Sequence, residues 1–108
     1  MERGEIWWVN FDRSVGGEIR KKRPAVIVSN NAANKYLNRI QVVPLSSSVQ
    51  RIYPSEAPVT FSGKNVKAMA DQISTVSKIR LTRRAGAMSR NDMEKIEDVI
   101  KIQLGLRL

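Results

Sequence analysis

The residues from Gly16 to Ser29, GGEIRKKRPAVIVS, join a charged loop to a strand that can hold it in place. Glu18 and four consecutive cations lie in the loop, and Pro24 then leads into a continuous apolar run. Because proline disfavours helix at the preceding residue, we expect Arg23 in extended backbone at the mouth of the strand. A short apolar run of this kind is typical of a buried strand. Arg23 is therefore a cation on a rigid support, an arrangement that suits phosphate chemistry.

The chain contains neither cysteine nor histidine, and this excludes several classes of chemistry. Disulfides, thiol nucleophiles and imidazole acid–base catalysis are ruled out, together with most transition-metal sites. Any catalysis has to use other groups, and we expect neither a metal nor another cofactor.

The charge balance favours a polyanionic partner. The chain has 19 Lys and Arg against 10 Asp and Glu, a net charge of +9, and the whole excess falls in residues 1–89. Such an excess is typical of proteins that bind nucleic acid. No apolar run is long enough to span a bilayer, and the N-terminal residues lack the order of a signal peptide. We therefore expect a cytoplasmic protein with no membrane contact.

The length of 108 residues predicts a single domain, residues 1–108. Short runs of branched and aromatic residues predict strands at residues 4–11, 24–29, 39–45, 57–61, 66–70, 72–76 and 85–88. Loops are expected at 12–17 and 30–38, and a hairpin turn at 62–65. Ser89 can cap a C-terminal helix with apolar residues at helical spacing. The pattern favours a mainly β fold with short helices, an SH3-like barrel.

Three strings of residues resemble, in order and spacing, the MazF/PemK family of toxin endoribonucleases. They are RPAVIVSNN from Arg23, VVPLSSSVQRIYP from Val42 and ADQISTV from Ala70, with RGEIWWVNFD from Arg3 as the opening. The resemblance implies an SH3-like barrel that forms a homodimer and cuts single-stranded RNA at short sequences without a metal. It also implies neutralisation by a cognate, MazE-like antitoxin.

Carried over by position, the family's catalytic arginine falls on Arg23, its catalytic threonine on Ser46 and its acidic loop residue on Glu18. Ser46 keeps the hydroxyl but lacks the methyl group that restricts the threonine rotamer. Attack of an RNA 2′-hydroxyl on phosphorus builds negative charge on the phosphoryl oxygens, which a guanidinium and a hydroxyl stabilise. The proton acceptor stays open, since Glu18 either takes the proton or orients Arg23.

Further RNA contacts are predicted around Arg23. The other loop cations, Arg20, Lys21 and Lys22, suit backbone phosphates. Ser47 and Gln72 are added as RNA contacts. The serine triplet at 46–48 is also typical of a turn, and Asp71-Gln72 fits a buried strand end equally well.

Trp7 and Trp8 alternate along the first predicted strand, so at most one enters the core, and we expect this to be Trp8. Aromatic residues make up only 6% of the chain, which argues against a base-stacking platform.

Two other classes of function stay open on the sequence. A non-catalytic basic barrel would bind RNA through charge alone. A CcdB-like toxin would share the barrel and inhibit DNA gyrase. The motifs around Arg23 and Ser46 favour the nuclease over both.

Overall fold

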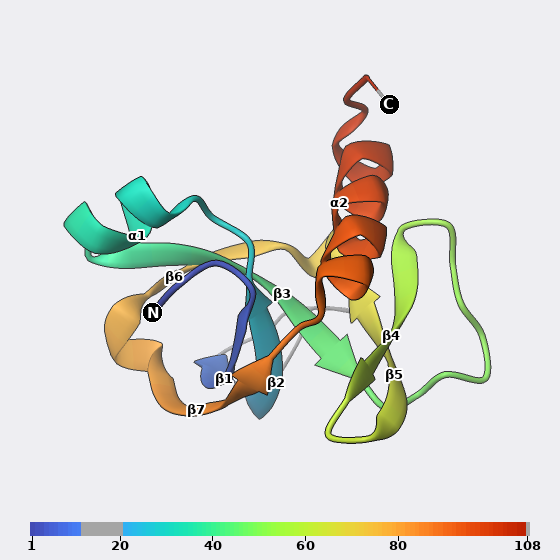
Figure 1. Cartoon of the computed structure of the whole chain (residues 1–108), viewed down its shortest axis with the longest axis horizontal. Helices are drawn as coiled ribbons and strands as arrows, with labels where there is room; N and C mark the ends of the chain where they lie inside the picture. The colour runs from blue at the N-terminus through green and yellow to red at the C-terminus, as the bar shows by residue number, and fades with distance from the viewer. Residues whose placement is uncertain (12–20, 108) are drawn as a thin grey trace.

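The computed structural model describes residues 1–11 and 21–107, so Glu18 and Arg20 lie outside the described residues. Figure 1 shows a bent sheet with a long C-terminal helix beside it. The elements are β1 (Glu5–Phe11), β2 (Lys21–Ile27), α1 (Asn31–Tyr36), β3 (Arg39–Ser46), β4 (Glu56–Phe61), β5 (Lys64–Met69), η1 (Ala70–Gln72), β6 (Ser74–Ser77), η2 (Lys78–Arg80), β7 (Leu81–Ala87) and α2 (Arg90–Leu104).

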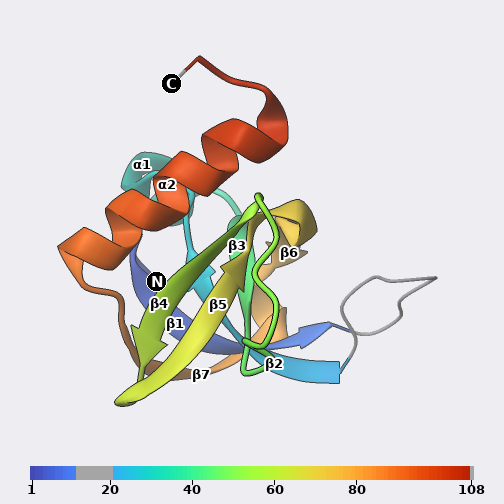
Figure 2. The ribbon, with the colours of Figure 1, turned by 90° about the vertical axis from the view of Figure 1, so that its right-hand side faces the viewer.

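The strands form one antiparallel sheet in the order β4-β5-β3-β2-β1-β7, and β6 also pairs with β3. β3 is the central strand of this sheet, because it pairs with β2, with β5 and with β6. In the described part of the chain β4 and β7 do not pair, so the barrel stays open between them. Figure 2 shows α2 lying across one end of the bent sheet. The prediction of a mainly β, SH3-like barrel with a C-terminal helix is confirmed.

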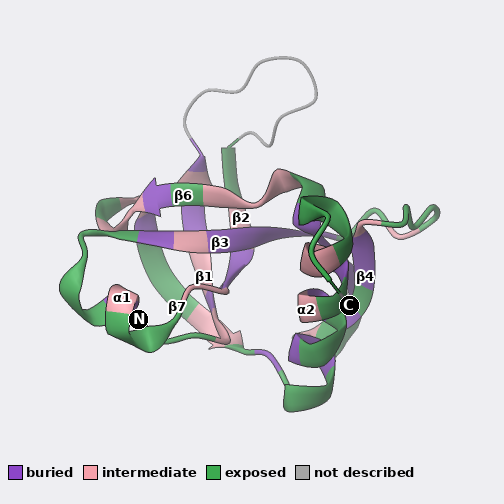
Figure 3. Cartoon of the chain, turned by 90° about the horizontal axis from the view of Figure 1, so that it is seen from above, coloured by how far each residue is buried: buried purple, intermediate pink, exposed green. Residues whose placement is uncertain are grey.

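The sheet is buried on both faces, which explains the uninterrupted apolar run in β2. Val26 packs in one cluster with Ile96 of α2. Its neighbours Ala25 and Ile27 belong to a second cluster, together with Val9 of β1. Figure 3 shows the buried segments along the central strands and on the inner side of α2. Alternate residues of β2 are thus packed in two separate clusters. This packing fixes the part of the strand that directly follows Arg23.

Local signals predict two connections, although the hairpin turn expected at 62–65 is shorter in the structure, since Lys64 and Asn65 already belong to β5. Ser62 and Gly63 have φ angles of 54° and 75°, as a two-residue type I′ turn between β4 and β5 requires. The Ser89 hydroxyl accepts a hydrogen bond from the Asp92 N–H at 3.1 Å and caps α2. The Asp92 carboxylate then accepts the N–H of Thr60 at 2.9 Å, which ties α2 to β4.

Other local predictions were wrong. The predicted loop 30–38 contains α1, because the Asn30 side chain accepts the Ala33 N–H at 2.8 Å and caps a helix. The strand predicted from residue 72 begins at Ser74, since η1 precedes it. β2 and β7 begin earlier than expected, at residues 21 and 81. The two tryptophans also exchange roles: Trp7 packs against the second cluster, whereas Trp8 borders a pocket.

Candidate active site

Strands β2 and β3 carry Arg23 and Ser46 into the lining of one pocket. The pairing of the two strands ends at Ala25 and Pro44, and Arg23 and Ser46 each lie two residues beyond that last pair, where β3 goes on to pair with β5. Both residues line one pocket of about 1120 Å³. The guanidinium and the hydroxyl that the sequence singles out therefore come from adjacent strands and meet at one place.

The environment of Arg23 favours an incoming acceptor. Its Nε is buried, and among the described residues it has no hydrogen-bond partner. A buried donor without an acceptor costs free energy. A phosphoryl oxygen would satisfy this donor once the atoms that cover Nε moved aside, and the charge of the guanidinium would strengthen the contact.

Ser46 is positioned to donate its hydroxyl proton. The residue is only 9% exposed, and its Oγ accepts a hydrogen bond from the Ser48 N–H at 3.1 Å. A hydroxyl has two acceptor lone pairs and one donor proton, so this contact leaves the proton available to an oxyanion. The serine triplet thus forms the turn that the sequence indicated and still presents its first hydroxyl to the pocket.

The pocket carries a strong positive charge. Its cationic lining residues are Lys21, Lys22, Arg23, Lys64, Arg83 and Arg84. No carboxylate is among the lining residues that the structure describes. These cations come from β2, β5 and β7, so the positive charge lies where the barrel is open. Such a concentration of one sign attracts a polyanion and raises its rate of association.

Three of the predicted RNA contacts reach this pocket and one does not. Lys21, Lys22 and Ser47 line it together with Arg23. Gln72 is not among the lining residues; it ends η1, and its carbonyl accepts the Ser74 hydroxyl at 2.8 Å.

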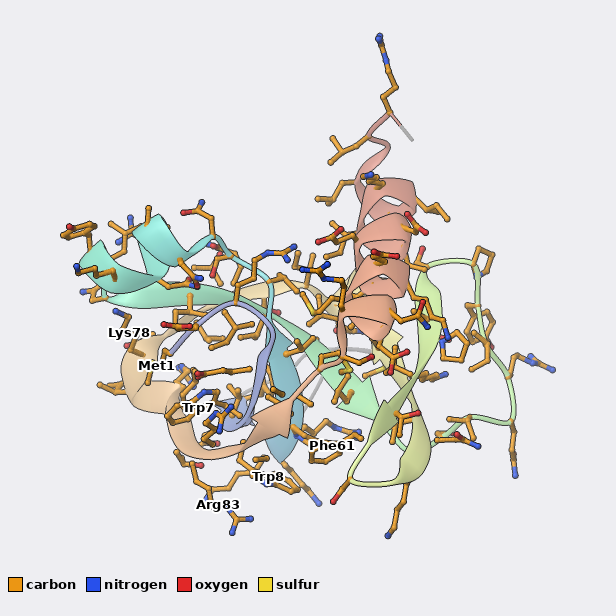
Figure 4. All side chains as sticks on the ribbon, in the orientation of Figure 1. Met1, Trp7, Trp8, Phe61, Lys78 and Arg83 are labelled. Atoms are coloured by element: carbon orange, nitrogen blue, oxygen red, sulfur yellow. The ribbon has the colours of Figure 1, made fainter. Side chains whose placement is uncertain are left out.

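Sequence reasoning missed the aromatic side of the pocket. Trp8 of β1 and Phe61 of β4 both line it, and the Arg83 guanidinium carbon lies 5.7 Å from the centre of the Trp8 ring. In Figure 4, Trp8, Phe61 and Arg83 lie at one end of the molecule, while Trp7 lies apart from them toward Met1. The basic run KIRLTRR at 78–84 was a signal for the cations of β7. Nothing local in the sequence places Phe61 beside Trp8, because their strands are not adjacent in the sheet.

Comparison with known proteins gives related sequences along nearly the whole chain. The family model described as PemK-like, MazF-like toxin of type II toxin-antitoxin system matches residues 2–104. Endoribonuclease MazF9 of Mycobacterium tuberculosis is 37% identical over 115 residues, and the match covers 98% of each chain. Endoribonuclease toxin MazF of Escherichia coli K12 is 26% identical, and the match covers 94% of this chain and 92% of the relative.

Solved structures agree with the sequence matches. A mycobacterial endoribonuclease in complex with its cognate antitoxin superposes with a TM-score of 0.84 at 26% identity, covering 100% of this chain and 98% of that one. MazF from Deinococcus radiodurans shares the fold with a TM-score of 0.86 at 22% identity, covering 98% and 97%. Since the family model spans the described sheet and all of α2, the protein belongs to the PemK/MazF family of toxins of type II toxin–antitoxin systems.

Proposed function

We propose that this protein is an endoribonuclease toxin that cleaves single-stranded RNA and is neutralised by a cognate antitoxin. The observation that carries the proposal is the meeting of Arg23 and Ser46 in one basic pocket. Relatives named endoribonucleases support the activity. The structural relative bound to its cognate antitoxin supports the second partner.

The reaction that fits this pocket is transesterification by the RNA itself. The 2′-oxygen attacks the adjacent phosphorus, the bond to the 5′-oxygen breaks, and the products end in a 2′,3′-cyclic phosphate and a 5′-hydroxyl. The charged guanidinium of Arg23 and the hydroxyl of Ser46 both donate hydrogen bonds to the phosphoryl oxygens. Because arginine stays protonated, Arg23 acts by charge stabilisation rather than as a base. Glu18 is the proposed acceptor of the 2′-hydroxyl proton; if it instead orients Arg23, water accepts that proton. The leaving 5′-oxygen takes up a proton from water.

Single-stranded RNA suits the pocket better than a duplex. The Trp8 and Phe61 rings border the pocket, and aromatic faces bind unpaired bases by stacking. Base faces are hidden in a duplex, whereas a single strand can splay them out. Lys21 and Lys22 hold backbone phosphates in this proposal, and Arg20, Ser47 and Gln72 complete the expected RNA contacts.

The proposed partners follow from the charge of the pocket and from the family. An acidic antitoxin segment would lie over the same cations and compete with RNA. A homodimer is proposed as the active form. The reaction is proposed to need no metal, because the guanidinium of Arg23 can stabilise the negative charge on the phosphoryl oxygens. Among residues 1–11 and 21–107, no helix is long and apolar enough to cross a membrane. We propose that the toxin acts in the cytoplasm.

One assay separates the proposed function from its rivals. Purified protein is incubated with a long single-stranded RNA in EDTA, and the 5′ ends of any fragments are mapped. Discrete fragments with 5′-hydroxyl ends that disappear with Arg23→Ala are expected. A mobility shift with intact RNA would indicate a non-catalytic binder. Intact RNA together with loss of DNA gyrase supercoiling would indicate a CcdB-like toxin.

A further inference from the structure

Lys67 of β5 is a buried cation that does not line the pocket described above. Its Nζ donates to Glu56 Oε1 at 3.0 Å and to the carbonyl of Arg51 at 3.0 Å. The side chains of Lys67 and Glu56 are only 9% and 7% exposed. Buried charges of this kind need both a partner and hydrogen bonds, and Lys67 obtains part of these from the backbone of residues 47–55, the segment that joins β3 to β4.

Glu56 holds the same segment at a second point. Its Oε1 also accepts the N–H of Tyr53 at 2.8 Å, and the Tyr53 ring centre lies 5.6 Å from Lys67 Nζ. Lys67 is the cross-strand partner of Pro58, so Glu56 is its diagonal neighbour on the adjacent strand. The ion pair therefore attaches residues 51 and 53 to the β4–β5 hairpin.

The beginning of the segment is attached to the hydroxyl of Ser46. Ser46 is the cross-strand partner of Lys67 on the other side of β5, and the Ser48 N–H donates to Ser46 Oγ. One residue, Lys67, thus pairs with Ser46 through its backbone and holds the following segment through its side chain. Only a few residues separate residues 51–53 from Ser48. A displacement of the backbone at residues 51–53 would therefore also displace Ser48 and, through its hydrogen bond, the Ser46 hydroxyl.

We propose that Lys67 is a positioning residue for RNA cleavage. Together with Glu56 it fixes residues 47–55, and through them the orientation of the Ser46 hydroxyl at the pocket. This inference rests on the proposed function. An apolar pair at these positions would stabilise the fold about as well, but it would leave the carbonyl of Arg51 and the N–H of Tyr53 without these partners. The ion pair is therefore suited to hold the segment in one conformation.

The decisive variant replaces both charges, Lys67→Met together with Glu56→Met. Removal of one charge alone would leave the other buried and unpaired, whereas removal of both is expected to keep the melting temperature close to wild type. We expect kcat for RNA cleavage to fall about 10-fold and KM to change less than about 2-fold, because displacement of a reacting group acts mainly on the chemical step. Glu97→Gln is the matched control, since it breaks the surface pair with Arg3 at 2.9 Å, which the loop contacts do not involve.

A conservative variant tests the same contacts without the loss of volume. Glu56→Gln keeps an amide oxygen for the Tyr53 N–H and for Lys67 Nζ but removes the charge that compensates Lys67, so its melting temperature is measured first. Under conditions where the variant is fully folded, kcat is expected to stay within about 2-fold of wild type. If folded Glu56→Gln lost as much activity as the double variant, hydrogen bonding to the segment would not explain the effect, and the proposal would be overturned.

Backbone amide exchange gives a readout that does not depend on cleavage. In the double variant, exchange at Ser48 and Tyr53 is expected to become faster, while core amides such as that of Ile96 keep their protection. Wild-type kcat in the double variant, or a loss of kcat with unchanged exchange at Ser48, would overturn the inference. Faster exchange at Ser48 in a protein whose wild type cuts no RNA would refute the proposed function and still support the attachment of the segment by Lys67.

Discussion

Arg23 and Ser46 line the same pocket, and each lies two residues beyond Ala25 and Pro44, the last pair between β2 and β3. Both side chains are therefore carried by strands of the sheet rather than by a loop. Ala25 and Pro44 are both buried, so a shift of one strand against the other would disrupt the packing of the core. The core thus holds in place the two strands that carry the groups to which we assign the chemistry.

Arg23→Ala is expected to lower the rate of RNA cleavage about 100-fold or more, because it removes a preorganised charge from the developing oxyanion. The rate is measured under single-turnover conditions with enzyme in excess. Arg39→Ala is the control, since Arg39 is an exposed arginine that does not line the pocket. Near-normal turnover in Arg23→Ala would remove this residue from the mechanism.

Ser46→Ala is expected to reduce cleavage strongly, whereas Ser46→Thr should keep or improve it. Threonine retains the hydroxyl and adds a methyl group that restricts the side-chain rotamer. Circular dichroism establishes that both variants are folded. A folded Ser46→Thr protein without activity would show that the residue matched to the family's threonine is the wrong one.

Trp8→Leu is expected to raise KM about 10-fold and to leave kcat nearly unchanged, since loss of one stacked base weakens RNA binding. Steady-state cleavage of a short RNA separates the two constants. Tyr36→Leu serves as the control because Tyr36 is 78% exposed and does not line the pocket. Equal effects of the two substitutions would argue against a base-binding role for Trp8.

The carboxyl of Glu5 links stability to pH. Burial alone would raise its pKa, but hydrogen bonds from Trp7 Nε1 and from the backbone of Glu2, with the charges of the N-terminus and Arg84, hold the pKa below its ordinary value. A carboxyl with a lowered pKa stabilises the folded state above its unfolded value of about 4.3, and this contribution is lost as the pH falls through the folded value.

Glu5→Gln is therefore expected to lower the melting temperature at pH 7 and to approach wild type as the pH falls through the lowered pKa of Glu5. Thermal unfolding of both proteins between pH 7 and pH 3 gives the comparison. A difference in melting temperature that does not change with pH would contradict the linkage.

Features with a local physical cause were predictable from the sequence. The apolar run after Pro24 predicts a buried strand, residues 62–65 predict a hairpin turn, and Ser89 predicts a helix cap. Each signal depends only on neighbours along the chain.

Other features depend on which strands pair, and the sequence alone could not provide them. Trp8 and Phe61 line one pocket only because β1 pairs with β7 and the β4–β5 hairpin borders the same pocket. Trp8 was therefore assigned to the core, although β1 turns it toward Arg83. Ser46 was identified only through the resemblance to the family, because a serine after a strand is common. The ion pair between Lys67 and Glu56 was not predicted, since the two residues become neighbours only through the pairing of β4 with β5.

A double-variant cycle on Arg23 and Ser46 tests the central claim most directly. Single-turnover cleavage rates are measured for wild type, Arg23→Ala, Ser46→Ala and the double variant. Groups that stabilise one oxyanion act as a unit, so the double variant is predicted to be within about 10-fold of the slower single variant. If the two losses instead multiplied in full, Arg23 and Ser46 would act independently, and their convergence on one phosphodiester would be contradicted.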